Sequence, residues 1–345
     1  MNEYVGAIHM HSIYSDGSGT VEEIVGYANE VGLDYIMITD HNTLRALNEG
    51  YEGWHNNTLL LVGCEINDKE NKNHYLAFGI DEAFSTRLSA KEYVKKVKSA
   101  GGIGFIAHPH EKRSSMKEHP AFPWTEWDTN DFTGIEIWNH MSEWMEGLTE
   151  ENKYQHFVHP LRSVAGPPAE TLQKWDELNQ ARKVVGIGGV DAHAHKINVL
   201  GFFEVEVFPY KVLFKSVRTH VLMNEKIDPK DFHKSKSLIY ESLRNGRCFV
   251  SNYYHGDATG FRFFAESDNK IFQMGDYISL KGKVKLRVFL PNISGKINLI
   301  CNGKLVDEVE NSDCEFIIRQ KGAYRVEVFL EGKAWIFSNH IRIGD

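Results

Sequence analysis

The chain has 345 residues, of which 42% are hydrophobic and 25% are charged, and its formal net charge at pH 7 is −8. These values are typical of a globular protein with a large core, and the acidic balance excludes a general surface for long nucleic acids. No stretch approaches the roughly 20 apolar residues of a membrane span, and a histidine pair lies too close to Met1 to leave room for a signal peptide. We therefore expect a cytoplasmic protein without a membrane segment.

Residues 1–256 alternate short apolar runs with amphipathic segments, a pattern typical of repeated βα units. Two helices are predicted to begin at Thr20 and Ser89, because each is followed three residues later by a glutamate that can complete a capping box. A third helix is predicted around residues 171–182. The predicted strands, in chain order, are 35–39, 59–62, 75–78, 103–107, 134–138 and 184–190.

Between about residues 111 and 170 this alternation weakens, and the segment is rich in tryptophan, proline and turn residues. Such composition is typical of long loops that run over the active-site face of an α/β protein. The aromatic side chains could simply cover the barrel, or they could form a cage for a substrate. The sequence leaves both interpretations open.

Residues 257–345 differ in character, because apolar and polar residues alternate and Gly or Asn turns separate the runs. This pattern predicts a small antiparallel β-sandwich that forms a second domain after a first domain of residues 1–256. The second segment contains a single histidine, His340, and no cluster of histidines with carboxylates. We expect it to have a structural or partner-facing role.

Histidines and carboxylates gather directly after the predicted strands, in a chain with 17 histidines. The first group is His9-Met-His11, the second is Thr39-Asp40-His41, and the third is Asp191-Ala-His193. Residues i and i+2 of a strand share one face, so His9 and His11 could bind one metal ion together, and so could Asp191 and His193. The carboxyl ends of the strands are also where an α/β barrel carries its active site. The sequence therefore predicts a metal centre at the mouth of a barrel.

The ordered set of motifs resembles that of the polymerase and histidinol phosphatase (PHP) family. The motifs are His9-x-His11 with Ser15-Asp16-Gly17, Thr39-Asp40-His41, Gly63-Cys-Glu65, Ala107-His108-Pro109 and Asp191-Ala-His193. The resemblance implies a distorted (β/α)7 TIM-like barrel that holds two or three divalent ions and cleaves phosphoesters. The stretches 134–139 and 243–248 are also similar to metallohydrolases of the carbaryl hydrolase type.

The resemblance implies nine ligands, among which Glu65 bridges two ions. The first ion would be held by His9, His11 and Asp191, the second by His74 and His108, and the third by Asp16, His41 and His193. His140 is the alternative to His74 for the second ion. Because the set mixes nitrogen and oxygen donors, zinc, manganese or iron suits it better than magnesium or calcium.

The implied reaction is hydrolysis by a metal-bound hydroxide that bridges two ions, with Asp191 either accepting the proton of the water or acting only as a ligand. The expected substrate is a small phosphorylated metabolite, a nucleotide or a short oligonucleotide. Candidates for contacts to the substrate are Arg113, His110, His140 and His195, and each could instead be an ordinary loop side chain. Arg113 is the first choice, because a guanidinium can bind phosphate with two hydrogen bonds.

Two other functions remain open. The same hydroxide could attack a carbonyl carbon, which would make the protein a carbamate, ester or amide hydrolase. The chain could also be a non-catalytic binding module that keeps only the fold. A degenerate module would be expected to lose ligands, and none of the nine positions is vacant here. The sequence does not fix the oligomeric state.

Overall fold

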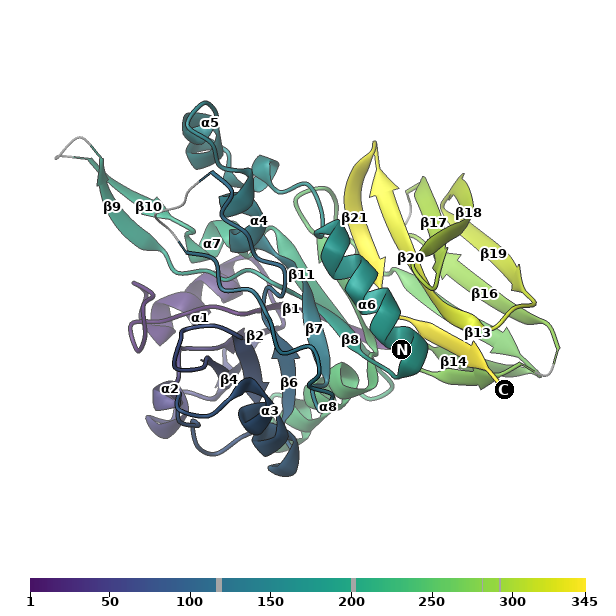
Figure 1. Cartoon of the computed structure of the whole chain (residues 1–345), viewed down its shortest axis with the longest axis horizontal. Helices are drawn as coiled ribbons and strands as arrows, with labels where there is room; N and C mark the ends of the chain where they lie inside the picture. Colours follow the sequence, from purple (N-terminus) through teal and green to yellow (C-terminus); the bar gives the residue numbers. More distant parts are fainter. Residues whose placement is uncertain (116–119, 200–202, 281, 292) are drawn as a thin grey trace.

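The computed structural model describes residues 1–115, 120–199, 203–280, 282–291 and 293–345. It is a mixed α/β structure whose N-terminal part carries the helices, followed by a C-terminal part made of strands (Figure 1). In the part of the chain that the structure describes, no helix has the length and apolar character needed to cross a bilayer.

The N-terminal strands form one curved sheet in the order β12-β11-β1-β2-β4-β5-β6-β7-β8. Neighbours are parallel from β1 to β4 and from β6 to β8, whereas β5, β11 and β12 run antiparallel to their neighbours. Strand β3 adds to the edge of β4. The bounds are β1 Asn2–Ile8, β2 Tyr35–Ile38, β3 Gly53–His55, β4 Thr58–Ile66, β5 Tyr75–Phe78, β6 Ile103–Ile106, β7 Gly134–Asn139, β8 Val185–Gly189, β11 Val217–Met223 and β12 Cys248–Asn252.

The predicted barrel is not closed by a ladder of strands. Strand β8 lies against β11 and β12 through side chains: Thr219 Oγ1 accepts from the Gly188 N–H (2.9 Å), and Asn339 Oδ1, after β21 (Lys333–Ser338), accepts from the Gly186 N–H (2.8 Å). The chain just after β8 pairs with the end of β1 through its backbone: the Val190 N–H donates to Ile8 O (2.9 Å) and the Asp191 N–H to His9 O (2.7 Å). A Cβ on Gly188 would lie within 2.6 Å of side-chain atoms of Val217 and Val250, so these valines fill the gap. The described residues therefore form a mixed α/β structure with a large, mostly parallel sheet, and the (β/α)7 barrel stays a prediction.

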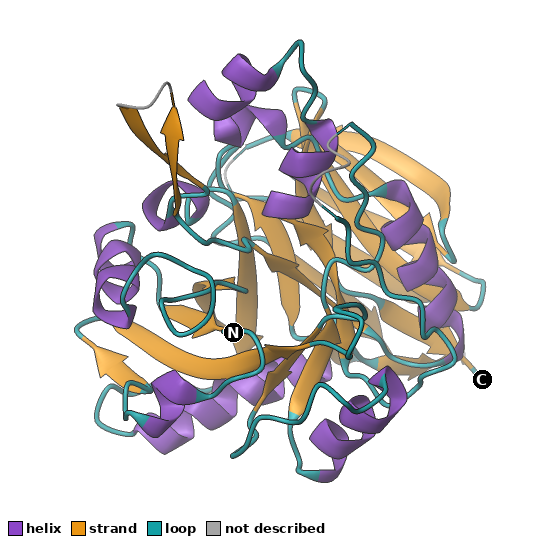
Figure 2. Ribbon diagram, turned by 60° about the vertical axis from the view of Figure 1, so that its left-hand side comes forward, coloured by secondary structure: helices purple, strands orange, loops and turns teal. Residues whose placement is uncertain are grey.

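Helices cover the outer side of this sheet (Figure 2). Both predicted capping boxes are present: Glu23 Oε2 accepts from the Thr20 N–H (2.8 Å) and Glu92 Oε2 from the Ser89 N–H (2.8 Å). The bounds are α1 Val21–Glu30, α2 Arg45–Asn48, α3 Ala90–Ser99, α4 His140–Gly147, α5 Lys153–Val158, the 3-10 turn Pro160–Ser163, α6 Ala169–Ala181, α7 Tyr210–Leu213 and α8 Phe232–Asn245.

The sheet is buried on both faces, which explains its continuous apolar runs. In β2, Ile36 and Ile38 pack towards α1, while Tyr35 and Met37 point into the concave side with residues of β4, β6 and β8. The Tyr35 ring occupies the space where a Cβ of Gly6 would be, at 2.4 Å, and its hydroxyl donates to Thr219 O (2.9 Å). The concave side is therefore a packed core, with polar groups gathered at one end.

The C-terminal part has two sheets that pack face to face around a core that includes Phe263, Leu286 and Val326. One sheet is β14-β13-β16-β19, and the other contains β15-β22-β20-β21 with β17 and β18. The bounds are β13 Arg262–Ser267, β14 Lys270–Gln273, β15 Tyr277–Ser279, β16 Val284–Phe289, β17 Gly295–Cys301, β18 Lys304–Asn311, β19 Asp313–Ile318, β20 Gly322–Leu330, β21 Lys333–Ser338 and β22 Ile341–Gly344; a separate hairpin consists of β9 His195–Val199 and β10 Phe203–Val207.

Strand β21 also pairs with β12, so the large sheet continues from the N-terminal part into the C-terminal part. Helix α6 lies against β20 at this junction (Figure 1). The predicted boundary between residues 256 and 257 falls in the loop after β12. The sheet continues across this boundary, because Phe249 of β12 pairs with Ser338 of β21. The division into two domains stays a prediction.

Candidate metal centre

The ligand candidates meet at one edge of the sheet. Several candidates directly follow parallel strands: His9 and His11 follow β1, His41 follows β2, His108 follows β6, and Asp191 and His193 follow β8. Glu65 lies near the end of β4. Strand β5 runs the opposite way, so His74, which precedes it, reaches the same edge. This antiparallel strand explains how a histidine before a strand joins ligands that follow strands.

The backbone at three of these positions is left-handed, with φ of 68° at His9, 26° at His108 and 53° at Asp191. Residues other than glycine adopt this region at a cost and tend to do so at functional sites. The premise that His9 and His11 share a strand face is therefore wrong, because β1 ends at Ile8. The turn still brings the two rings together, with 5.3 Å between their centroids.

Glu65 is the hub of the centre. Glu65 Oε1 lies 2.7 Å from His74 Nδ1 and 3.2 Å from His108 Nε2. Glu65 Oε2 lies 3.0 Å from His9 Nε2, 3.2 Å from His11 Nε2 and 3.5 Å from His41 Nδ1. Its side chain is 1% exposed. One buried carboxylate thus faces five imidazoles.

Two aspartates complete the group. Asp191 Oδ1 lies 3.3 Å from Nε2 of both His9 and His11. Asp16, which is half-exposed, lies 3.4 Å from His193 Nε2 and 3.6 Å from His41 Nε2. The structure therefore brings all nine predicted ligand residues into one cluster, which we call the ligand cluster.

The ligand cluster fits divalent metal ions. Donor atoms within 4.8 Å of one another fall into four overlapping sets, and imidazole nitrogen mixed with carboxylate oxygen is the donor set of transition metals. Several buried nitrogens, among them His74 Nε2 and His108 Nδ1, have no hydrogen-bond partner within the described ranges. The four sets are His11, Asp16, His41 and His193; His9, Glu65 and His108; His9, His11 and Asp191; and His41, Glu65 and His74.

Electrostatics also favour positive charge at this position. Burial alone would raise the pKa of Glu65, but the imidazoles of His9, His41 and the others around it hold that pKa well below its ordinary value. Burial would lower the pKa of His11, yet its contacts with Asp191 and Glu65 outweigh this effect and raise the pKa to about 10. The carboxylates thus stay ionised and attract cations, which are protons or metal ions.

Two residues behind the ligands were not assigned from the sequence. Glu136 Oε1 lies 2.9 Å from His9 Nδ1, while its Oε2 accepts from the His108 N–H (2.7 Å) and from Asn139 Nδ2 (2.9 Å). Asn139 Nδ2 also donates to Asp191 Oδ2 (3.1 Å). The signal in the sequence was a glutamate inside the apolar strand of residues 134–138, because a charge is buried there only if it is paired.

We expect Glu136→Gln to lower metal affinity about 10- to 100-fold, because a carboxylate behind a ligating imidazole fixes its orientation and its basicity. Titration of the metal-free protein with Mn²⁺ or Zn²⁺ measures the change. Glu146→Gln, a glutamate on α4 bound to Ser114, is the control and should bind metal as the original chain does. An unchanged affinity in Glu136→Gln would remove its positioning role.

A cavity of about 310 Å³ opens over the ligand cluster. Arg113 and His195, two of the predicted substrate contacts, line this cavity together with Glu111. Seven members of the ligand cluster also line it, namely Asp16, His41, Glu65, His74, His108, Asp191 and His193. The remaining lining residues are apolar, and these are Pro120, Phe122, Met141, Trp144, Met145, Leu148, Phe157, Val207 and Phe208.

The structure does not place the other two predicted substrate contacts in this cavity. His110 lines a different cavity, where its Nδ1 lies 3.0 Å from Thr171 Oγ1 and its ring stacks on Trp127. His140 is fully buried at the start of α4, and burial lowers its pKa to about 3. His74 lies within a potential metal set and His140 does not, among the described residues. The geometry therefore favours His74 over His140 as the ligand.

Comparison with known proteins identifies a domain in the N-terminal part of the chain. Residues 7–107 match the family model of the PHP domain. An uncharacterized protein of Methanocaldococcus jannaschii is 27% identical over 152 residues, which span 38% of this chain and 80% of that protein.

Two solved structures are also similar. A two-domain protein of Bacteroides vulgatus ATCC 8482 containing a predicted PHP-like metal-dependent phosphoesterase is 17% identical, with a TM-score of 0.48, over 98% of this chain and 95% of that chain. A putative metal-dependent phosphoesterase of Bifidobacterium adolescentis is 18% identical, with a TM-score of 0.35, over 58% of this chain and 92% of that chain. From the family model and the motifs within its range, the chain carries a PHP domain over residues 7–107.

Proposed function

We propose that this protein is a metal-dependent hydrolase that cleaves a phosphate ester of a small molecule at the ligand cluster. The observation that carries the proposal is the buried Glu65 carboxylate facing five imidazoles, with Asp191 and Asp16 beside it. We propose two or three divalent ions, with zinc, manganese or iron as candidates. Ions bound here would supply a hydroxide at neutral pH and polarise the phosphoryl oxygens.

Formal charge supports an anionic substrate. The ligand cluster contains three carboxylates, Asp16, Glu65 and Asp191, which contribute −3. Two divalent ions would leave a formal charge of +1 and three would leave +3, so the loaded centre attracts an anion although the whole chain is acidic. A phosphate monoester dianion is the matching ligand.

The surrounding side chains hold this centre in place. Asn139 Nδ2 donates a hydrogen bond to Asp191 Oδ2, whereas Asp191 Oδ1 faces His9 and His11. We therefore assign Asp191 as a ligand rather than a general base. Asp40, next to His41, accepts from the Ser12 N–H (2.6 Å), Ser12 Oγ (2.7 Å) and Ser15 Oγ (2.8 Å). Asp40 thereby fixes the turn that carries Asp16.

The test is release of inorganic phosphate from a panel of phosphate monoesters and nucleotides, by protein loaded separately with Mn²⁺, Zn²⁺ or Fe²⁺. We expect turnover that a chelator abolishes and added metal restores, with a lower melting temperature for the chelated protein. Aryl esters and carbamates form the second arm. Turnover of these carbonyl substrates alone would replace the phosphoesterase by an ester or carbamate hydrolase, and a protein that binds no metal and turns over neither class would be a non-catalytic module.

A further inference from the structure

One face of helix α4 is apolar and lines the cavity above the ligand cluster. Met141, Trp144, Met145 and Leu148 recur at positions i, i+3, i+4 and i+7, and all four line this cavity. The other face of the helix carries Ser142, Glu143 and Glu146, which line a separate cavity of about 350 Å³. Trp144 and Leu148 are buried in the core, whereas Met141 and Met145 are half-buried, so this stripe both packs against the core and borders the cavity.

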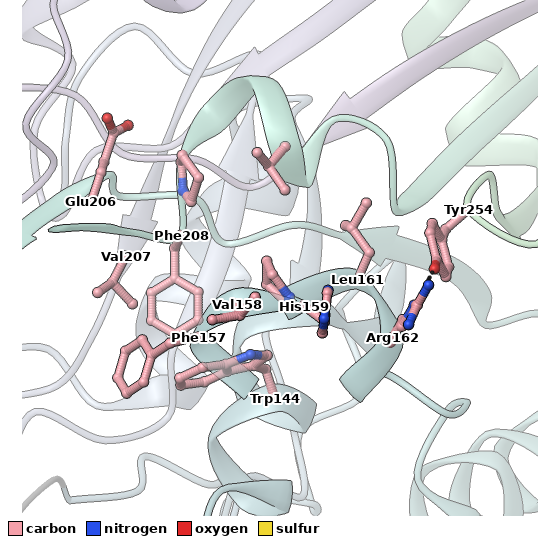
Figure 3. Close-up of a pocket in the computed structure, with 13 residues that line it drawn as sticks. Trp144, Phe157, Val158, His159, Leu161, Arg162, Glu206, Val207, Phe208 and Tyr254 are labelled. Atoms are coloured by element: carbon pink, nitrogen blue, oxygen red, sulfur yellow. Dashed lines mark hydrogen bonds between the residues drawn. The ribbon is translucent and has the colours of Figure 1, made fainter. Parts of the chain in front are cut away.

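Aromatic rings from two other segments extend this face. The Trp144 ring meets Phe157 of α5 edge to face, with 5.2 Å between centroids, and meets Phe208 beyond β10 in the same way at 5.0 Å. Figure 3 shows the three rings close together at a neighbouring cavity of about 400 Å³. The same three residues also line the cavity over the ligand cluster. We call Met141, Trp144, Met145, Leu148, Phe157 and Phe208 the apolar wall.

Few polar side chains outside the ligand cluster line this cavity in the described part of the chain. Outside the ligand cluster, the polar side chains that line this cavity in the described ranges are Glu111, Arg113 and His195. Two of them are already paired, because an Arg113 guanidinium nitrogen donates to Glu111 Oε1 (2.6 Å). Glu111 also accepts from Ser142 Oγ (2.6 Å) and from the Phe122 N–H (2.7 Å). Outside the ligand cluster, Arg113 Nε, which has no hydrogen-bond partner among the described residues, and His195 are therefore the described polar groups of the lining that remain to bind the hydroxyls of a sugar or the edge of a base.

We propose that the substrate is an ester of an apolar alcohol or phenol, whose hydrocarbon part lies on the apolar wall while its anionic head lies at the ligand cluster. The proposal rests on the phosphoesterase function proposed above. Hydroxyls placed against methionine and aromatic side chains would lose their hydrogen bonds to water, whereas a hydrocarbon gains from leaving water. A cavity of about 310 Å³ suits a leaving group of one or two rings.

The first test compares benzyl phosphate with glycerol 1-phosphate, using metal-loaded protein. Both are esters of primary alcohols, so the chemistry of the leaving group is matched and the hydrocarbon part differs. We expect kcat/KM for benzyl phosphate to be about 10-fold higher or more. Calorimetry should also show tighter binding of benzylphosphonate than of methylphosphonate, which reports the wall without turnover. Equal or reversed preferences in both measurements overturn the proposal.

The second test changes the wall itself. Met141→Gln combined with Met145→Gln keeps side-chain length and helix propensity but makes two half-buried wall positions polar. We expect the preference for benzyl phosphate to fall about 10-fold, mainly through KM. Phe157→Ala, at a side chain that is 41% exposed, removes wall surface without disturbing the core and should act in the same direction.

Tyr154→Gln is the matched control, because Tyr154 is on α5, is 76% exposed and does not line the cavity. It should leave the preference unchanged. If phosphate esters are cleaved without a preference that depends on Met141 and Met145, the wall proposal fails and the phosphoesterase stands. If benzyl acetate or a benzyl carbamate is cleaved instead, with that dependence, the phosphoesterase and the anionic head fail, and only the contact between the hydrocarbon part and the apolar wall stands.

Discussion

Glu65→Gln is expected to abolish tight metal binding and to lower kcat/KM for phosphate esters by about a thousandfold or more, because bound ions contribute several kcal/mol of charge stabilisation in such reactions. The substitution keeps the size of the side chain but removes its charge. Five imidazoles within 3.5 Å would then lose their shared anion. Elemental analysis of the purified protein and release of inorganic phosphate measure the two effects.

Glu177→Gln serves as the control for this experiment. Glu177 is exposed on α6 and pairs only with Lys174 among the ion pairs of the described chain, so metal content and activity should stay at their original values. Far-ultraviolet circular dichroism of both variants separates a lost site from a lost fold. A Glu65→Gln protein with full metal content and full activity would rule out Glu65 as a ligand.

Asp176→Asn is expected to destabilise the fold by about 3 kcal/mol, because it removes one of the two carboxylates that pair with the buried Arg325 guanidinium and leaves Glu327 as its partner. Asp176, on α6, is 3% exposed and accepts two hydrogen bonds of 2.7 Å from Arg325 on β20 and one of 2.7 Å from His340 Nε2. These contacts cross the predicted domain boundary. Urea unfolding at pH 7 measures the loss, and Glu177→Gln on the same helix should unfold like the original chain.

The stability that the Asp176–Arg325 ion pair contributes depends on pH through the pKa of Asp176. Burial alone would raise that pKa, but the hydrogen bonds and charges of Arg325 and His340 outweigh burial and lower it from 3.8 to about 2. A lowered pKa gives stability that is fully present above about 3.8 and is lost as the pH falls towards 2, worth roughly 2 kcal/mol. The difference in the free energy of unfolding between the original chain and Asp176→Asn should therefore become smaller from pH 5 to pH 2. A difference that stays constant over this range would show that Asp176 does not titrate with unfolding.

The local features of the fold followed from short stretches of sequence. The capping boxes at Thr20 and Ser89 need only residues three apart, and the strands at 75–78 and 134–138 need only a run of apolar residues. The contact between β8 and the strands at the other end of the sheet could not be obtained in this way. It depends on valines of β11 and β12 that occupy the space beside Gly188 and on hydrogen bonds between residues 190–192 and 8–11, and no local pattern reports contacts between strands so far apart in the chain.

From the sequence by itself, the resemblance of the ordered motifs to the PHP family predicts the nine members of the ligand cluster, with His140 left open as the alternative to His74. Only the tertiary structure decided that Glu136 stands behind His9, that His110 and His140 lie away from the cavity, and that an apolar face of α4 borders it. The physical reason is the separation along the chain of the residues that decide each feature. A motif fixes which atoms can coordinate an ion, whereas orientation, burial and the shape of a cavity arise from packing between segments that are distant in the chain.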